Sequence, residues 1–145
     1  RLLVQQGYRL IVIVNGHGAW GQTATLERLA VEFSHETPSK VIVGFPTIAR
    51  EGEEIDFGHA CDVETALMQY LTDGCVDLSQ LPPRDVKLKY TDWGIADDCV
   101  FTGHPSADKC VVRDPRDATP EQGERFFRVA LEHLCRQVTD AYQDL

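Results

Sequence analysis

The feature that most constrains the fold is an apolar run from Leu10 to Val14, which leads directly into a glycine-rich turn and then a helical pattern. This run is too short for a helix and is apolar on both faces, as a strand in a parallel sheet covered on both sides is. A second such run covers residues 40–44, and between the two runs residues 23–34 carry apolar side chains at helical spacing. This alternation predicts an α/β domain with a mainly parallel sheet.

Further elements are expected in the second half of the chain. The segment from about His59 to Thr72 has the spacing of a helix, and a short strand is expected near Val86–Tyr90 within a long loop. A last strand is expected at Cys110–Val112. Because 145 residues is an ordinary size for one domain, residues 1–145 are predicted to form a single domain.

The last helix has the clearest start signal. Thr119 can cap it, Pro120 suits its first position, and Gln122 completes a capping box. The turn before it, Asp114-Pro-Arg-Asp117, is expected to be structural. The expected buried stripe of the helix consists of Phe127, Ala130, Leu131, Leu134, Val138 and Ala141.

Charge and cysteine content exclude several classes of protein. The chain has 14 lysines and arginines against 23 aspartates and glutamates, a net charge of −9, and such a surface repels nucleic-acid backbones and anionic membranes. No apolar run approaches the ~18 residues of a transmembrane helix. Five cysteines without Cys-x-x-Cys spacing fit free thiols better than disulfides or structural zinc, which predicts a cytoplasmic protein.

The first residues suggest that the chain starts inside a longer protein. It begins with Arg1, and Leu2–Val4 has the pattern of a helix end that Gly7 closes. We therefore expect part of any functional site to lie outside these residues.

The turn after the first strand, Asn15-Gly-His-Gly-Ala-Trp-Gly21, carries the main candidate for chemistry. His17 stands just past the carboxyl end of a buried strand, where open α/β sheets bind ligands. Gly16 and Gly18 let the backbone turn sharply and a ligand approach closely. A neutral imidazole at such a place suits zinc, manganese or iron, whereas the structural alternative is a histidine that only hydrogen-bonds within the turn.

The same turn also fits a dinucleotide-binding pattern. Gly16, Gly18 and Gly21 match G-x-G-x-x-G between a strand and a helix. That fingerprint needs an acid about 20 residues on, at the end of the next strand, to hold the ribose. Here no carboxylate follows the second strand before Glu51, so nucleotide binding is kept only as an alternative.

The segment around His59 holds the second candidate. At helical spacing Glu64 falls inside an apolar stripe, while Asp62 and Gln69 point away. A carboxylate in such a stripe must be paired, protonated or bound to metal, because burying it bare is costly. Asp56 precedes His59 by three residues, and an acid beside an imidazole raises its basicity, which suits a proton shuttle. The structural alternatives are an ion pair with an arginine or hydrogen bonds to backbone amides at Glu64, and helix capping by His59. The stripe consists of Ala60, Val63, Leu67, Met68 and Leu71.

Three motifs, in this order, resemble those of the creatininase (creatinine amidohydrolase) family. They are Asn15-Gly-His-Gly18, His59-Ala with Glu64-Thr65, and Asp114-Pro-Arg-Asp-Ala-Thr119. The family patterns are N-G-H-G, H-A-x-x-x-E-T and D-P-R-x-A-T, and the resemblance spans roughly residues 1–143. It implies a three-layer α/β/α sandwich and a metal-dependent hydrolase that acts on non-peptide C–N bonds.

The resemblance also implies a site with two divalent metals, commonly zinc, manganese or iron. By this resemblance His17 would be a metal ligand, and His59 would transfer a proton near the scissile bond. Asp56 would orient His59 or touch the substrate, and Gly18 would line the substrate pocket. The residues expected to support these groups without binding metal are Asn15 and Glu64. The resemblance also implies assembly as a homohexamer, so a homo-oligomer is expected.

The chain departs from the family pattern in three ways. The upstream segment E-x-H-G-P-H-L-P-x-G-T-D, which supplies a Glu, a His and a bridging Asp, is absent, so the chain corresponds to roughly the C-terminal three-fifths of a member. Creatininases have a glutamate where this chain has Ala19 and a tryptophan where it has Ile55, which argues against creatinine as substrate. Trp20 changes the usual N-G-H-G-G-N and is expected to reshape the substrate pocket or to plug a neighbouring subunit.

The resulting hypothesis is a metal-dependent hydrolase of a cyclic amide, a formamide or a related small molecule. In it, metal-activated water attacks the substrate and His59 passes a proton to the leaving nitrogen. One alternative is a non-catalytic subunit of the same fold, or one completed by a partner chain that supplies the missing Glu, His and Asp ligands. The other is the dinucleotide-binding domain. No nucleic-acid or membrane partner is expected.

Overall fold

The structure is a computed structural model that describes residues 1–53, 61–86, 88–91, 94–96 and 114–145. The chain divides into two compact units. The first contains residues 1–50 and 129–145, and the second contains residues 51–128. The helices and the small parallel sheet described below fit an α/β fold, while the organisation as one domain stays a prediction.

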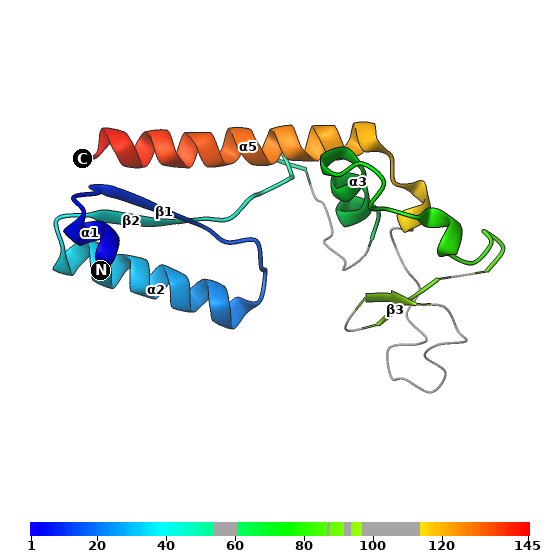
Figure 1. The fold of residues 1–145 in the computed structure, drawn as a ribbon, viewed down its shortest axis with the longest axis horizontal. Coiled ribbons are helices and arrows are strands. Elements are labelled where there is room, and N and C mark those ends of the chain that lie inside the picture. The colour runs from blue at the N-terminus through cyan, green and yellow to red at the C-terminus, as the bar shows by residue number, and fades with distance from the viewer. Residues whose placement is uncertain (54–60, 87, 92–93, 97–113) are drawn as a thin grey trace. The chain divides into compact units, whose positions relative to one another are not determined.

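The first unit is built on two parallel strands, β1 (Leu10–Val14) and β2 (Lys40–Gly44), with helix α2 (Trp20–Glu36) between them in the chain. In Figure 1 the strands lie between α2 and the C-terminal part of helix α5 (Pro120–Gln143). Both strands are confirmed at the predicted residues, but their predicted burial is wrong: apart from the buried Gly44, their residues are half-buried, and Val14 is exposed. The predicted helix is confirmed as well, although it begins at Trp20 rather than at Thr23.

Close contacts join both helices to β2. The Ser34 hydroxyl of α2 donates to the carbonyl of Ala30 (2.7 Å) and accepts a hydrogen bond from the backbone N–H of Val41 in β2 (2.8 Å). On α5, Leu134 lies so close to the end of β2 that a Cβ at Gly44 would be 2.6 Å from Leu134 Cδ2. The absence of a side chain at Gly44 therefore lets α5 pack directly on the strand.

The first unit opens with a short helix, α1 (Leu2–Gln5). Gly7 follows it with φ 87°, in the left-handed region that glycine favours, which confirms the predicted helix end. None of the helices among the described residues is long and apolar enough to cross a membrane.

The second unit contains helix α3, two 3₁₀ turns, a hairpin and the first turns of α5. Its elements are α3 (Asp62–Leu71), η1 (Leu78–Gln80), β3 (Lys89–Thr91), β4 (Gly94–Ala96) and η2 (Pro115–Asp117). The short strand predicted near Val86–Tyr90 is β3, and it pairs antiparallel with β4. The strand predicted at Cys110–Val112 lies outside the described residues.

The carboxylate buried on α3 is not the predicted one. Glu64 is exposed, although its spacing placed it in the apolar stripe, whereas Asp62 is only 7% exposed. The prediction of a buried Glu64 is therefore wrong. The cause is the docking of α5: a Cβ at Gly123 would overlap the carbonyl of Ala66, and this close approach turns the face with Asp62 and Val63 inward.

The predicted burial of the apolar residues on α3 also differs from the structure. Met68 and Leu71, both in the predicted stripe, are 44% and 53% exposed. Ala66 is fully buried, and the Tyr70 ring lies 5.8 Å from that of Phe127 on α5, measured between centroids. The side of α3 that meets α5 thus runs through Ala66 and Tyr70.

The start of α5 agrees with the prediction. Thr119 Oγ1 accepts a hydrogen bond from the backbone N–H of Gln122 (3.3 Å), and Gln122 Oε1 accepts one from the N–H of Thr119 (3.0 Å). Pro120 is the first helical residue. The capping box is therefore confirmed.

The buried stripe of α5 differs from the prediction in the first turns. Phe126 and Val129 are 2% and 6% exposed, whereas Leu131, a predicted stripe residue, is 49% exposed. The guanidinium carbon of Arg125 lies 4.8 Å from the centroid of the Phe126 ring. Ala141 is buried as predicted. Because α5 contributes to two units, it buries different faces along its length, which a single continuous stripe cannot describe.

Candidate functional site

The turn after β1 is held by the side chain of Asn15. This residue is 3% exposed, and its backbone N–H donates to the carbonyl of Gly44 (2.8 Å), so the pairing of β1 with β2 continues into the turn. Asn15 Oδ1 accepts a hydrogen bond from the backbone N–H of His17 (3.1 Å), and Asn15 Nδ2 donates to the carbonyl of His17 (3.0 Å). One buried carboxamide therefore fixes the backbone of His17 on both sides.

The first turn of α2 completes this arrangement. Asn15 Oδ1 also accepts from Gln22 Nε2 (2.8 Å), and Asn15 Nδ2 also donates to Thr23 Oγ1 (3.2 Å). A carboxamide has two donors and an oxygen with two lone pairs, so all four are used. Exchanging the oxygen and nitrogen would oppose donor to donor and acceptor to acceptor at His17, so the contacts define the orientation of the amide. We call Asn15, His17, Gln22 and Thr23 the Asn15 network.

The ring of His17 is presented at the end of β1. The residue is exposed, and within the described part of the chain no hydrogen bond engages its ring nitrogens. Its backbone is fixed while both nitrogens stay available, which suits a neutral imidazole that binds a metal ion. Asn15 lies behind His17 as a supporting residue, as the sequence predicts, although its role toward a metal stays a prediction.

Two more residues of this turn were predicted to contact substrate. A Cβ at Gly18 would lie 3.8 Å from Phe45 Cζ, an ordinary contact, so the segments that follow β1 and β2 meet here. Trp20, the first residue of α2, is 85% exposed. Their roles in substrate binding stay predictions. Sequence reasoning missed Phe45, for which the available signal was an aromatic residue directly after the second apolar run.

The second predicted part of the site lies outside the described residues, because it consists of Asp56 and His59. Their roles in proton transfer stay predictions. Helix α3 begins at Asp62 with Cys61 as its N-cap, and the alternative of His59 as a helix cap also lies outside the described residues. Glu64 is exposed on α3, and its supporting role stays a prediction.

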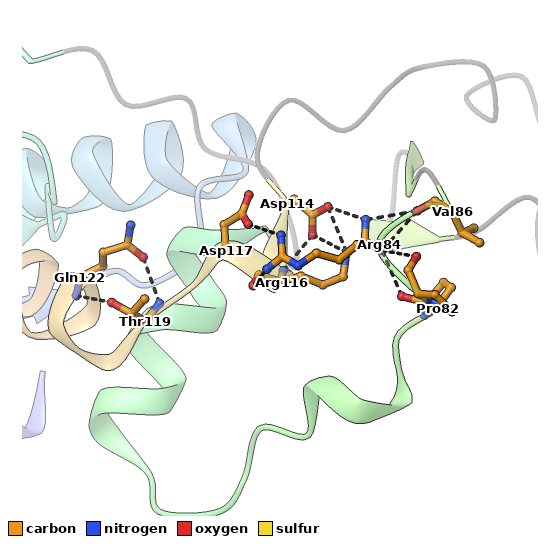
Figure 2. A network of polar contacts seen from close by, with 9 residues as sticks. Pro82, Arg84, Val86, Asp114, Arg116, Asp117, Thr119 and Gln122 are labelled. Atoms are coloured by element: carbon orange, nitrogen blue, oxygen red, sulfur yellow. Dashed lines mark hydrogen bonds and ion pairs between the residues drawn. The ribbon is translucent and has the colours of Figure 1, made fainter.

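A second turn of the same type precedes α5, and Figure 2 shows it. Asp114 Oδ1 accepts a hydrogen bond from the backbone N–H of Arg116 (2.8 Å). Both carboxylate oxygens also accept from the guanidinium group, with Nε at 2.9 and 3.0 Å and Nη2 at 2.5 Å. These side-chain hydrogen bonds lower the pKa of Asp114 and raise the pKa of Arg116.

Arg116 also binds the backbone of residues 82–86. Its Nη1 donates to the carbonyls of Pro82 (3.0 Å) and Pro83 (2.7 Å), and both Nη1 and Nη2 lie 3.2 Å from the carbonyl of Val86. The side chain is 9% exposed and every nitrogen of its guanidinium group is engaged, so none is left for a ligand. The structural role predicted for this turn is confirmed.

Arg84 adds a second, exposed connection. Its Nη1 lies 2.5 Å from Asp117 Oδ1, and its Nη2 donates to the carbonyl of Arg116 (2.5 Å), as Figure 2 shows. The residues that take part in these contacts, which we call the Arg116 clamp, are Pro82, Pro83, Arg84, Val86, Asp114, Arg116 and Asp117. The clamp joins residues 82–86 to the turn before α5.

Comparison with known proteins connects the two turns. The family model described as creatinine amidohydrolase (creatininase) matches residues 1–138, a span that contains both. The chain belongs to the creatininase family. Members of this family are amidohydrolases and typically bind divalent metals. No curated protein and no solved structure gave a significant match to this creatininase-family chain.

The residues that could hold such a metal are only partly described. In residues 1–53 and in the other described ranges, no group of three or more His, Cys, Asp and Glu side chains could hold a metal ion. At the end of β1, this creatininase-family chain presents the exposed imidazole of His17, a type of donor that suits such metals. A metal centre in this chain stays a prediction.

The alternative of dinucleotide binding gains nothing from the described geometry. The residue after β2 is Phe45, whose ring lies next to Gly18, and no carboxylate occurs there to hold a ribose. The glycine pattern of Gly16, Gly18 and Gly21 stays an untested alternative.

Proposed function

We propose that this chain acts as a metal-dependent hydrolase of a non-peptide C–N bond in a small molecule, such as a cyclic amide or a formamide. The observation that carries the proposal is the exposed ring of His17 on a backbone held by Asn15 at the end of β1. Membership of an amidohydrolase family supports the type of reaction. A three-layer α/β/α sandwich belongs to the same proposal.

In this proposal His17 binds metal through a ring nitrogen. The other ligands come from residues outside the described ranges: a Glu, a His and an Asp of an upstream segment or of a partner chain. Two divalent ions of zinc, manganese or iron per complete site would polarise a carbonyl oxygen and lower the pKa of bound water. The contribution of the chain is to fix the imidazole before the metal arrives, because Asn15 holds its backbone on both sides.

His59 is the proposed proton-transfer residue. It passes a proton to the leaving nitrogen, since expulsion of an amine from a C–N bond requires protonation of that nitrogen. Asp56 orients the His59 ring or contacts the substrate. Glu64 supports this region from the surface of α3.

The substrate is proposed to differ from creatinine. Ala19 and Ile55 stand where creatininases have a glutamate and a tryptophan. Gly18 leaves space beside Phe45, and the exposed Trp20 either borders the substrate or enters a neighbouring subunit of a homo-oligomer. A cytoplasmic location is proposed with these assignments.

A panel of substrates tests the proposal. Purified protein is incubated with cyclic amides and with formamides in the presence of Zn²⁺, Mn²⁺ or Fe²⁺, and the released amine or opened ring is measured. We expect turnover of at least one class, loss of turnover with a chelator, and recovery when metal is restored. No turnover of any class with any of the three metals contradicts the proposal.

Two variants assign the proton transfer. His59→Ala should lower turnover by about 10²–10⁴ while bound metal stays unchanged. The matched control is His35→Ala, an exposed histidine in the last turn of α2, which should keep wild-type turnover. Unchanged turnover in His59→Ala removes that residue from the proposed role.

A further inference from the structure

We propose that Gln22 and Thr23 are positioning residues that hold His17 in place for a metal ion, although neither touches the His17 ring. This inference rests on the proposed function, which makes His17 a ligand. Both residues act through Asn15: Gln22 Nε2 donates to its Oδ1 (2.8 Å), and Thr23 Oγ1 accepts from its Nδ2 (3.2 Å).

The argument starts from the position of these residues. Gln22 and Thr23 lie in the first turn of α2. The backbone N–H groups of both residues donate to the carbonyl of Ala19. They are therefore fixed by the helix, and they contact the same amide oxygen and nitrogen of Asn15 that bind the backbone of His17. Asn15 is 3% exposed, so water replaces a lost partner only poorly. The helix thus holds the amide that holds the backbone of His17.

The polarity of the contacts makes the role specific. Gln22 presents a donor to Asn15, which keeps the amide oxygen turned toward Gln22 and toward the N–H of His17. A carboxylate at position 22 presents only acceptors, and it favours the exchanged amide with Nδ2 turned toward it. That exchange breaks both hydrogen bonds between Asn15 and the backbone of His17, the one that Asn15 Nδ2 donates and the one that Asn15 Oδ1 accepts.

The same substitution separates positioning from helix stability. Helix α2 has no acidic residue in its first turn, so Gln22→Glu should strengthen the helix through its dipole. A purely structural role for Gln22 therefore predicts equal or higher stability without any effect on metal binding. The positioning role predicts weaker metal binding in a helix that is at least as stable.

The first measurement is zinc affinity, obtained by competition with a chromophoric chelator. Gln22→Glu and Thr23→Val should each weaken Zn²⁺ binding by about tenfold, the lower range for loss of a residue that orients a ligand. Thr23→Ser, which keeps the hydroxyl, should restore wild-type affinity. The control is Thr25→Val, because Thr25 Oγ1 donates to the carbonyl of Gly21 (2.7 Å) on the same helix and lies outside the Asn15 network.

The second measurement needs neither metal nor activity. Hydrogen exchange of the His17 backbone amide, measured in the metal-free protein, should be faster in Gln22→Glu and Thr23→Val than in wild type and in Thr25→Val. Wild-type zinc affinity together with wild-type exchange in both variants overturns the inference. An equal loss of affinity in Thr25→Val also overturns it, since any change in the first turns of α2 then has the same effect.

His17→Ala distinguishes the failure of this inference from that of the proposed function. If His17→Ala loses zinc while Gln22→Glu and Thr23→Val bind it as wild type does, only the positioning role is wrong. If His17→Ala binds zinc as wild type does, the proposed ligand is wrong. Exchange of the His17 amide in the Gln22→Glu and Thr23→Val variants then decides by itself whether the network holds this backbone.

Discussion

At both Asn15 and Asp114 a short side chain accepts a hydrogen bond from the backbone N–H two residues later, at 3.1 Å from His17 and 2.8 Å from Arg116. The outcome for the later residue differs. The His17 side chain is exposed and its ring has no hydrogen bond among the described residues, whereas the Arg116 side chain is 9% exposed with all of its nitrogens engaged. The two turns share the same hydrogen bond from the backbone, but the side chain of the later residue makes no hydrogen bond with the described part of the chain in one turn and is fully hydrogen-bonded in the other.

The difference lies in what satisfies the first residue of each turn. The carboxylate of Asp114 accepts its remaining hydrogen bonds from the guanidinium group of Arg116. The side chain of Arg116 is therefore engaged within its own turn. The neutral amide of Asn15 takes them from Gln22 and Thr23 on the following helix, so the ring of His17 is left for another use. Of these two turns, the one at Asn15 therefore leaves its following side chain available, as the proposed function requires.

The largest expected effect on stability is at Arg116. Lysine offers one point charge in place of a planar fork, so Arg116→Lys leaves carbonyls in residues 82–86 without their donors. The free energy of unfolding should fall by about 2–4 kcal/mol, measured by urea denaturation. Arg136→Lys, an exposed position on α5, should stay within about 0.5 kcal/mol of wild type. An equally small change in Arg116→Lys would show that the clamp is not structural.

A smaller loss is expected at Asn15. Asn15→Asp keeps the shape of the side chain but removes both donors, so the hydrogen bond to the carbonyl of His17 is lost, while the Thr23 hydroxyl can still donate to the new carboxylate. The free energy of unfolding of the metal-free protein should fall by about 1–3 kcal/mol in urea denaturation. Stability equal to that of wild type would show that the Asn15 network does not hold the turn.

The two turns should also differ in their response to acid. Arg116 lowers the pKa of Asp114 below its ordinary value of 3.8 in the folded protein, so the unfolded chain binds this proton at higher pH. The stability from this pair is therefore complete above the ordinary value and is lost as the pH falls through the lowered one. Unfolding experiments between about pH 2 and pH 6 should show this loss in wild type and in Asn15→Ala. Asp114→Asn should lack it, and an unchanged acid profile in that variant would contradict the assignment.

The smallest effect on the clamp is expected at Arg84. The side chains of Arg84 and Asp117 are 65% and 61% exposed, and ion pairs as exposed as this one contribute about 0–1 kcal/mol. Arg84→Ala should therefore lower the free energy of unfolding by less than Arg116→Lys does, and the difference from wild type should shrink at high salt. A loss as large as that in Arg116→Lys would show that the exposed connection, rather than Arg116, holds residues 82–86.

Much of the fold could be predicted because its signals are local. The strands β1 and β2 follow from short apolar runs, and the capping box of Thr119 and Gln122 follows from residues three positions apart. The buried faces of α3 and α5 could not be predicted in the same way. They depend on the close approach of Gly123 to Ala66, a contact between residues far apart in the sequence.

In the candidate site too, the residues with local sequence signals could be predicted and the others could not. His17 and Asn15 could be predicted because the turn that contains them is short and directly follows the apolar run that forms β1. Gln22 and Thr23 could not, since their contacts with Asn15 depend on where α2 begins, and that was predicted three residues too late. Polar residues in the first turn of the helix after an Asn-Gly-His-Gly sequence are the signal that could have found them.

The most direct test of the central claim is the metal content of His17→Ala, determined by elemental analysis beside wild type and His35→Ala. Because the ring of His17 makes no hydrogen bond among the described residues, the metal-free variant should unfold within about 0.5 kcal/mol of wild type. Its bound metal should nevertheless fall, while His35→Ala keeps the wild-type amount. Equal metal in all three proteins would contradict the account of His17 as a presented ligand.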